Sequence, residues 1–241
     1  MVKERYSFSK LNSFETCPYM YYQSYFMKEK GLSNAFAEYG TLVHSIMERY
    51  AKGELGILEL PDVYIDEFSK MTETFPKMKF CDLKETYYKQ GLEFLQNFSG
   101  YDKYKILDVE QQFEIPINDF IFNGIIDLIF EDENGNLVIQ DYKSKAKFKN
   151  KKEQAEYARQ LYLYSLYIKN TYGKFPSMLK FSMFRHNQII DIPFDEKSLT
   201  EAITWATNTV DKIRKCWDYE RKPEEFFCKN ICNYRETCNC F

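Results

Sequence analysis

Short apolar stretches in the middle of the chain alternate with longer stretches that have the apolar period of a helix. Strand-like stretches, rich in Ile, Phe, Val and Leu, occupy residues 105–116, 120–130, 137–143, 178–185 and 188–193. Helix-like stretches occupy residues 8–27, 37–52, 62–99 around Pro76, 152–170 and 196–218. The order of these stretches predicts an α/β domain in which a helix, three strands, a helix and a strand follow one another.

The turn between the second and third strands decides which side chains share a face of the sheet. Asn134-Gly135 is a strong hairpin signal, and it permits two registers. A two-residue loop would set Asp127 opposite Tyr142 and send Asp127 and Asp141 to opposite faces. A three-residue loop of residues 133–135, with its glycine in the left-handed conformation, would set Asp127 opposite Asp141.

The three-residue loop gathers charge inside an otherwise apolar hairpin. It places Asp127, Asp141 and Lys143 on one face, because side chains alternate along a strand. Two neighbouring carboxylates raise each other's pKa and repel unless a cation lies between them. Magnesium or manganese suits such oxygen ligands. The same Asp-x-Lys spelling occurs at 82–84 and 195–197, so the weight of this triplet comes from its place at the end of an apolar strand.

Length and composition predict one domain with a small appendage. The chain has 241 residues, of which 44% are hydrophobic and 29% charged, enough to bury a single core. The aromatic-rich segment 53–104 is expected to be a helical insertion or cap. No apolar run reaches membrane-spanning length, and the first residues lack a signal-peptide hydrophobic region, so a cytoplasmic location is expected.

The charge pattern restricts how the chain could bind nucleic acid. A net charge of −3 argues against a uniformly basic surface, so DNA contact must rest on a local patch. KSKAKFKNKK, residues 143–152, carries six lysines beside the charged hairpin. Taken alone it fits a solvated charge run as well as a DNA-facing loop, and its position favours phosphate contact. The sequence has no P-loop motif, so any helicase would be a partner.

Seven cysteines form the second chemical signal. An odd number argues against a disulfide framework in a reducing compartment. Four of the seven lie in the last fourteen residues, a density typical of zinc or iron–sulfur ligation. Cys81 and Cys216 have no cysteine at ligand spacing and are expected to be small buried apolar side chains.

Five motifs occur in an order that resembles one family. They are SFSKLNSFETCPYMYY (7–22), GTLVHSIME (40–48), the hairpin with its Asp-Tyr-Lys, RQLYLYSLY (159–167) and CKNICNYRETC (228–238). Together they resemble the RecB-like exonuclease branch of the PD-(D/E)xK nuclease superfamily, which includes AddB-type nuclease domains and CRISPR-associated RecB-like exonucleases. The resemblance covers nearly the whole chain and implies a restriction-endonuclease-like αβββαβ core with a mixed sheet, within a single nuclease domain spanning 1–241.

The resemblance also implies two metal centres. A structural 4Fe-4S cluster would join the amino-terminal and carboxyl-terminal segments, 1–30 and 219–241, through Cys17, Cys228, Cys232 and Cys238. The spacing C-x-x-x-C at 228–232 departs from the family's usual C-x-x-C, and Cys240 is an extra candidate, so a shifted ligand and zinc stay open. The catalytic metal would be held by His44, Asp127, Asp141 and the backbone carbonyl of Tyr142.

The remaining site residues are assigned by the same resemblance. Lys143 would position or deprotonate the attacking water, and Gln160 and Tyr164, four apart on one helix face, would reach the active site or the DNA. Glu110, on the strand before the hairpin, is a weaker candidate for a second metal or a supporting role.

The expected function is a magnesium- or manganese-dependent DNA exonuclease acting on single strands or DNA ends. The alternative is a DNA-end-processing or DNA-binding subunit of a CRISPR adaptation or recombination complex with little activity alone. A catalytically idle metal scaffold is disfavoured, because buried charges without a metal are costly. Cleavage polarity, strand preference and oligomeric state have no signal in the sequence.

Overall fold

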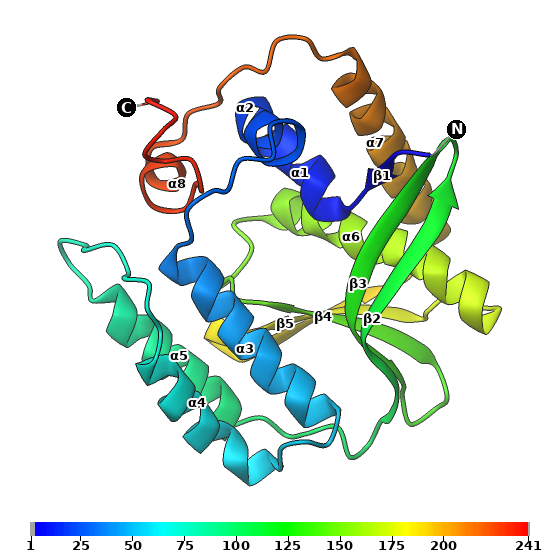
Figure 1. Cartoon of the computed structure of the whole chain (residues 1–241). Coiled ribbons are helices and arrows are strands. Elements are labelled where there is room, and N and C mark those ends of the chain that lie inside the picture. Colours follow the sequence, from blue (N-terminus) through cyan, green and yellow to red (C-terminus); the bar gives the residue numbers. More distant parts are fainter. Residues whose placement is uncertain (1–2, 241) are drawn as a thin grey trace.

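The computed structural model describes residues 3–240 and places a mixed six-stranded sheet between two groups of helices (Figure 1). The strands are β1 (Arg5–Tyr6), β2 (Lys105–Ile117), β3 (Phe120–Glu131), β4 (Leu137–Lys143), β5 (Met178–Met183) and β6 (Gln188–Pro193). The α-helices are α1 (Phe8–Thr16), α2 (Pro18–Tyr21), α3 (Ala35–Ala51), α4 (Leu60–Ser69), α5 (Leu83–Gln96), α6 (Lys151–Tyr172), α7 (Glu196–Lys215) and α8 (Glu225–Asn230). Shorter helical turns are η1 (Tyr22–Phe26), η2 (Ile57–Glu59) and η3 (Phe184–His186).

The sheet confirms the predicted order of the core. Its strands run β1-β3-β4-β5-β6, with β2 pairing with β3 outside this path. The elements α3, β2, β3, β4, α6 and β5 form the expected αβββαβ unit. The crossover through α6 makes β4 and β5 parallel, whereas β2, β3 and β4 pair antiparallel, so the sheet is mixed.

Two apolar cores cover the two faces of the sheet. Helices α1, α6 and α7 lie on one side, and their core includes Phe122, Leu161 and Phe181. Helices α3, α4 and α5 lie on the other side, in a second core (Figure 1) that includes Ile46 and Phe184. The segment 53–104 contains η2, α4 and α5, and its status as an insertion stays a prediction.

The hairpin adopts the register of the three-residue loop. Leu128 pairs with Gln140 and Glu131 with Leu137, which makes Asp127 and Asp141 the next opposed positions. The glycine of the loop, Gly135, has φ of +75°, the left-handed conformation that the sequence predicted.

Several boundaries differ from the prediction for local reasons. The helix expected over 8–27 is broken at Cys17, whose extended backbone (φ −159°) follows from the proline after it. Residues 62–99 form two helices separated by the loop 70–82, and the strand expected over 178–185 ends at Met183. The last long helix ends at Lys215, and β1 and α8 were not predicted.

The two ends of the chain are held together by hydrogen bonds. Tyr19 N donates to Glu220 O at 3.2 Å, and Leu32 N donates to Asn233 O at 2.8 Å. The Tyr234 hydroxyl donates to Glu29 O at 3.0 Å. Segments at opposite ends of the sequence therefore form one unit beside the sheet. Within residues 3–240, none of the helices has the length and apolar composition needed to cross a bilayer.

Candidate active site

The two aspartates of the hairpin lie where β3 and β4 separate. Pairing between the strands ends at Leu128 and Gln140, and from there β4 continues beside β5. Asp127 Oδ2 accepts a hydrogen bond of 2.7 Å from the backbone N–H of Tyr142, so a side chain takes over where the ladder stops. Asp127 is 8% exposed and Asp141 is 3% exposed. The sheet therefore holds two buried carboxylates at the point where β3 and β4 separate.

Asp141 belongs to a network that includes α6. Gln160 Nε2 donates to Asp141 Oδ1 and to the Tyr164 hydroxyl, each at 2.9 Å, and Gln160 Oε1 accepts from Lys143 Nζ at 2.9 Å. Asp141 Oδ2 lies 2.7 Å from Lys143 Nζ as an ion pair, but it receives no hydrogen bond of suitable direction. Gln160 thus fixes both charged groups, and Asp141 Oδ2 faces the Lys143 ammonium.

His44, on α3, lies beside the same two carboxylates. Its Nδ1 lies 3.4 Å from Asp127 Oδ2, and its ring stands edge-on to Tyr142 and Phe184. Burial lowers the pKa of His44, and the nearby Asp141 carboxylate opposes this shift only in part. The imidazole is therefore neutral near pH 7, which is the form that ligates metals.

Glu110 joins the site more closely than the sequence suggested. One ligand atom from each of His44, Glu110 and Asp127 lies within 4.8 Å of the others, the one such set of three or more among the residues that the structure describes. Glu110 falls opposite Asp127, since Val109 pairs with Leu128 and Gln111 with Ile126. Its φ of +52° is a strained conformation for a non-glycine residue.

Electrostatics give this arrangement a preference for a cation. Burial raises the pKa of Asp127 well above its usual range, and the Asp141 carboxylate adds to the shift. Burial and the Glu48 carboxylate likewise raise the pKa of Glu110. The carboxylates of Glu110 and Asp127 with a neutral imidazole are a donor set that suits a hard divalent cation, whereas Asp141 is held by Lys143 and Gln160 and lies outside this group of three.

The lysine-rich segment 143–152 is partly neutralised by α6. Lys145 Nζ pairs with Glu153 Oε1 at 2.6 Å, and the Lys149 N–H donates to the same carboxylate. The ring of Phe148 packs on Tyr157. These contacts anchor the segment 143–152 beside Asp141 and Lys143, so the position of its other lysine side chains is restricted.

Five cysteines gather where the chain ends meet. Cys17, Cys232 and Cys238 are buried and the other two, Cys228 and Cys240, are half-buried. Burial raises the pKa of Cys232, with further contributions from the thiols of Cys228, Cys238 and Cys17. Hydrogen bonding to Cys238, whose Sγ lies 3.0 Å away, raises the pKa of Cys240 to about 12.

The prediction for the other two cysteines was wrong for Cys81 and only partly confirmed for Cys216, which packs against the core on the α6 side of the sheet. Cys81 is exposed, and Cys216 is only half-buried. Cys81 lies in the loop before α5, where the chain leaves the core, so its apolar character did not determine its burial.

One family model and two solved structures resemble this chain. A sequence model described as the PD-(D/E)XK nuclease superfamily matches residues 5–239. A candidate exonuclease from Eubacterium rectale has a crystal structure that superposes with a TM-score of 0.53 at 13% identity, over 93% of this chain and 92% of that one. The crystal structure of SSO0001 gives a TM-score of 0.43 at 16% identity, over 99% of this chain and 88% of that one. Among curated proteins, no sequence matches.

Asp127→Asn should stabilise the metal-free protein. The raised pKa of Asp127 means that the folded state keeps a proton that the unfolded chain releases above about pH 4, so this group costs stability as pH rises. Asparagine removes that cost and keeps an acceptor for Tyr142 N–H. In EDTA near about pH 7.5, the variant should exceed the wild type by about 1 kcal/mol or more in urea unfolding.

Manganese should reverse this order, because it stabilises the site with the intact carboxylate. The lowered pKa of His44 acts in the opposite direction, since its contribution to stability rises with pH, so the two proteins are compared at each pH. Equal stability of the two proteins in EDTA from about pH 4.5 to 8 would contradict the prediction.

Proposed function

Because the chain belongs to the PD-(D/E)XK nuclease superfamily, we propose that it is a divalent-metal-dependent deoxyribonuclease that works as an exonuclease on single strands or DNA ends. Membership assigns it to the nucleases, and the substrate and the mode of cleavage are the proposal. The observation that carries it is the convergence of Asp127, Asp141 and Lys143 at the split between β3 and β4. A structural protein has no use for two repelling carboxylates in that position.

The catalytic cation would be magnesium or manganese. His44, Asp127, Asp141 and the Tyr142 carbonyl are the proposed ligands, and Glu110 is close enough to add a further oxygen. A cation bound there would neutralise the scissile phosphate and lower the pKa of a bound water.

The protein's own residues would order the reaction around that phosphate. Lys143 is fixed between Asp141 Oδ2 and Gln160 Oε1, so its ammonium can hold the attacking water or offset charge on the phosphate oxygens. Hydrolysis forms a bond between the water oxygen and phosphorus and breaks the bond to the leaving sugar oxygen, which takes up a proton. Gln160 and Tyr164 would position Lys143 and Asp141.

The five gathered cysteines support a structural cluster. We assign Cys17, Cys228, Cys232 and Cys238 as ligands of a 4Fe-4S cluster. Zinc held by four thiolates is the alternative, and the resemblance to the RecB-like exonuclease branch favours the iron–sulfur cluster. Since the sequence carries no P-loop, a helicase partner would supply single strands from duplex DNA.

Asp141→Asn, Lys143→Ala and His44→Ala should each lower manganese-dependent cleavage of an end-labelled single-stranded oligonucleotide by about 100-fold or more. Lys180→Ala and Asp191→Asn are matched controls, since they break an ion pair of 2.7 Å on β5 and β6. The controls should cleave like the wild type. Wild-type activity in Lys143→Ala would refute the proposed mechanism.

Glu110→Gln should weaken manganese binding by about 10-fold without unfolding the protein, because a carboxylate oxygen is lost from the group of ligands. Electron paramagnetic resonance of free manganese measures the binding. Glu114→Gln on the same strand, where Glu114 is paired with Arg5 at 2.9 Å, should bind manganese normally. Unchanged affinity in Glu110→Gln would remove Glu110 from the site.

Cys232→Ala should lose iron and visible absorption and should unfold at a lower temperature, because the link between the chain ends is lost. Cys81→Ala is the control, since Cys81 is exposed and lies outside the gathered group. Elemental analysis, absorption spectra and thermal unfolding measure the three effects. Zinc in the purified wild type, in place of iron, would count against the iron–sulfur assignment.

A further inference from the structure

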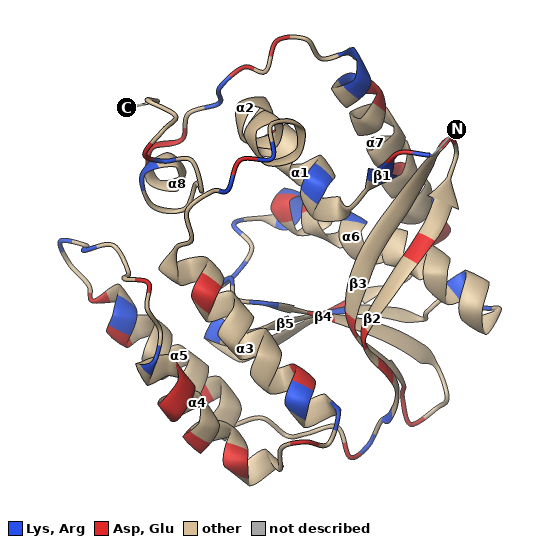
Figure 2. Cartoon of the chain, in the orientation of Figure 1, with Lys and Arg blue, Asp and Glu red and all other residues tan. Residues whose placement is uncertain are grey.

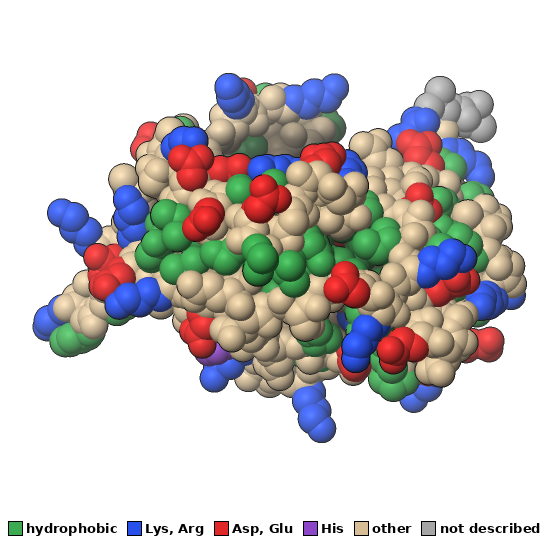
Figure 3. All heavy atoms as spheres, turned by 90° about the horizontal axis from the view of Figure 1, so that it is seen from below, with side chains coloured by type: hydrophobic (Ala, Val, Ile, Leu, Met, Phe, Trp, Pro, Cys, Tyr) green, Lys and Arg blue, Asp and Glu red, His purple; other side chains and the backbone are tan. Residues whose placement is uncertain are grey.

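The loop between α4 and α5 is fixed at its base and projects from the molecule. The backbone N–H groups of Thr72 and Glu73 donate to the Glu38 carboxylate of α3 at 2.8 and 2.7 Å. Phe75 packs against Phe36, with ring centroids 5.5 Å apart. Beyond this anchor the loop forms the leftmost projection in Figures 1 and 3, with basic and apolar side chains gathered on it.

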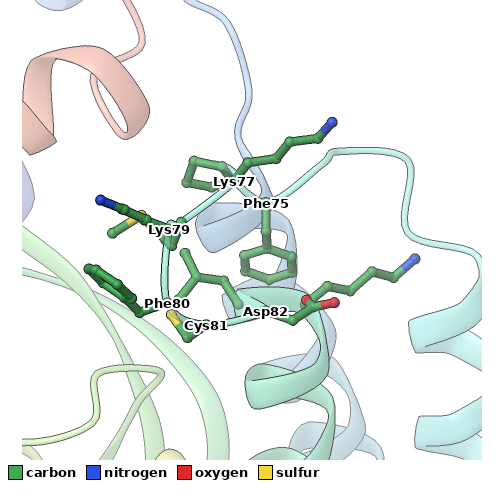
Figure 4. Close-up of a pocket in the computed structure, with 10 residues that line it drawn as sticks. Phe75, Lys77, Lys79, Phe80, Cys81 and Asp82 are labelled. Carbon is green, nitrogen blue, oxygen red and sulfur yellow. The ribbon is translucent and has the colours of Figure 1, made fainter.

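The projecting part alternates lysine with apolar side chains, in the sequence Lys77-Met78-Lys79-Phe80. Phe80 is 90% exposed and Met78 is 45% exposed. Lys79 Nζ lies 5.2 Å from the centre of the Phe80 ring. Residues 75–84 line a hollow of about 530 Å³. Figure 4 shows Lys79 and Phe80 extending to one side of the loop, whereas Phe75 points toward the helices.

This loop and the lysine-rich segment 143–152 flank the same end of α3. Glu38 holds the loop, and a side chain added at Gly40 would meet Ser144 Oγ at 3.4 Å. Figure 2 shows basic residues along both segments, on either side of the amino-terminal end of α3. Glu38 precedes His44 by six residues, which is about 9 Å along a helix. The two basic segments therefore border the approach to the proposed metal ligands.

We propose that residues 75–84 bind an unpaired DNA strand on its way to the active site, with Lys77 and Lys79 at phosphates and the Phe80 ring stacked on a base. The proposal rests on the nuclease function above, narrows its substrate to an unpaired strand and adds the residues that recognise it. An exposed aromatic ring next to cations is the combination that single-strand binding uses. Inside a duplex, neighbouring bases already cover both faces of each base, so the ring has no face to stack on. Because the chain carries a net charge of −3, such local cations must supply its attraction for DNA.

The test measures binding apart from cleavage. Fluorescence anisotropy in EDTA follows a labelled oligothymidine of about 20 nucleotides, long enough to span the loop and the site. Phe80→Ala should weaken binding by about 5- to 100-fold, the range for loss of one stacked base. Phe80→Trp should restore binding, with quenching of its fluorescence on the oligonucleotide. Lys79→Gln should weaken binding at low salt and reduce its salt dependence by about one phosphate contact.

Leu58→Ala is the matched control, since Leu58 is 88% exposed and lies on η2, away from this loop. It should bind like the wild type. Equal binding by Phe80→Ala and wild type would overturn the proposal. The proposal would also be overturned if Phe80→Ala lost as much affinity for blunt duplex DNA as for the single strand. The same holds if Phe80→Ala lost binding to phosphatidylserine vesicles but kept its full affinity for DNA.

Cleavage separates this inference from the nuclease function. If the wild type cleaves DNA with manganese and Phe80→Ala binds normally, the loop proposal alone fails. If the wild type does not cleave but binds single strands through Phe80, the nuclease proposal fails and the binding site stands.

Discussion

The hydrogen bond from Tyr142 N–H to Asp127 Oδ2 is the contact on which the site depends. It forms where β3 turns away from β4, so it ties a side chain of one strand to the backbone of the next. Tyr142 is held in turn by stacking on Phe184 in the core under α3 and α5. Two carboxylates that would separate in water are thereby kept together at the expense of stability, and core packing offsets that cost. In the proposed function, a bound cation would relieve this repulsion.

The hairpin at Asn134-Gly135 was predictable from a local signal. The choice of the three-residue loop over the two-residue loop rested on which register brings Asp127 to Asp141, and the structure has that register. The position of Glu110 was harder to predict. It depends on the pairing of the long strands β2 and β3, whose register shifts between Ile106 and Asp108. It also depends on the positive φ of Glu110, which a glutamate in the sequence does not predict. Residue type failed to predict the exposure of Cys81. The path of its loop is set by contacts elsewhere, such as the hydrogen bonds to Glu38, and these carry the loop away from the core.

The cysteines and the carboxylates serve different needs of the same chain. The proposed cluster would connect Cys17 with Cys228, closing a loop of most of the sequence, and in the chain-entropy picture a crosslink of that length contributes on the order of 5 kcal/mol. Hydrogen bonds such as Leu32 N to Asn233 O already hold these segments in register. The cluster would therefore reinforce an existing contact, which fits a structural role with no part in hydrolysis.

Attraction for DNA cannot be read from the number of lysines alone. Glu153 of α6 already pairs with Lys145 and accepts a hydrogen bond from the Lys149 backbone, so it neutralises part of the positive charge of the segment 143–152. A strand that reaches the carboxylates has to overcome their negative charge before a metal offsets it. In the proposed binding site, Lys77, Lys79 and Phe80 would share the attraction of DNA with the lysine-rich segment 143–152, which lies on the other side of α3. If both proposals hold, helix α3, which carries Glu38, Gly40 and His44, would align strand binding with cleavage.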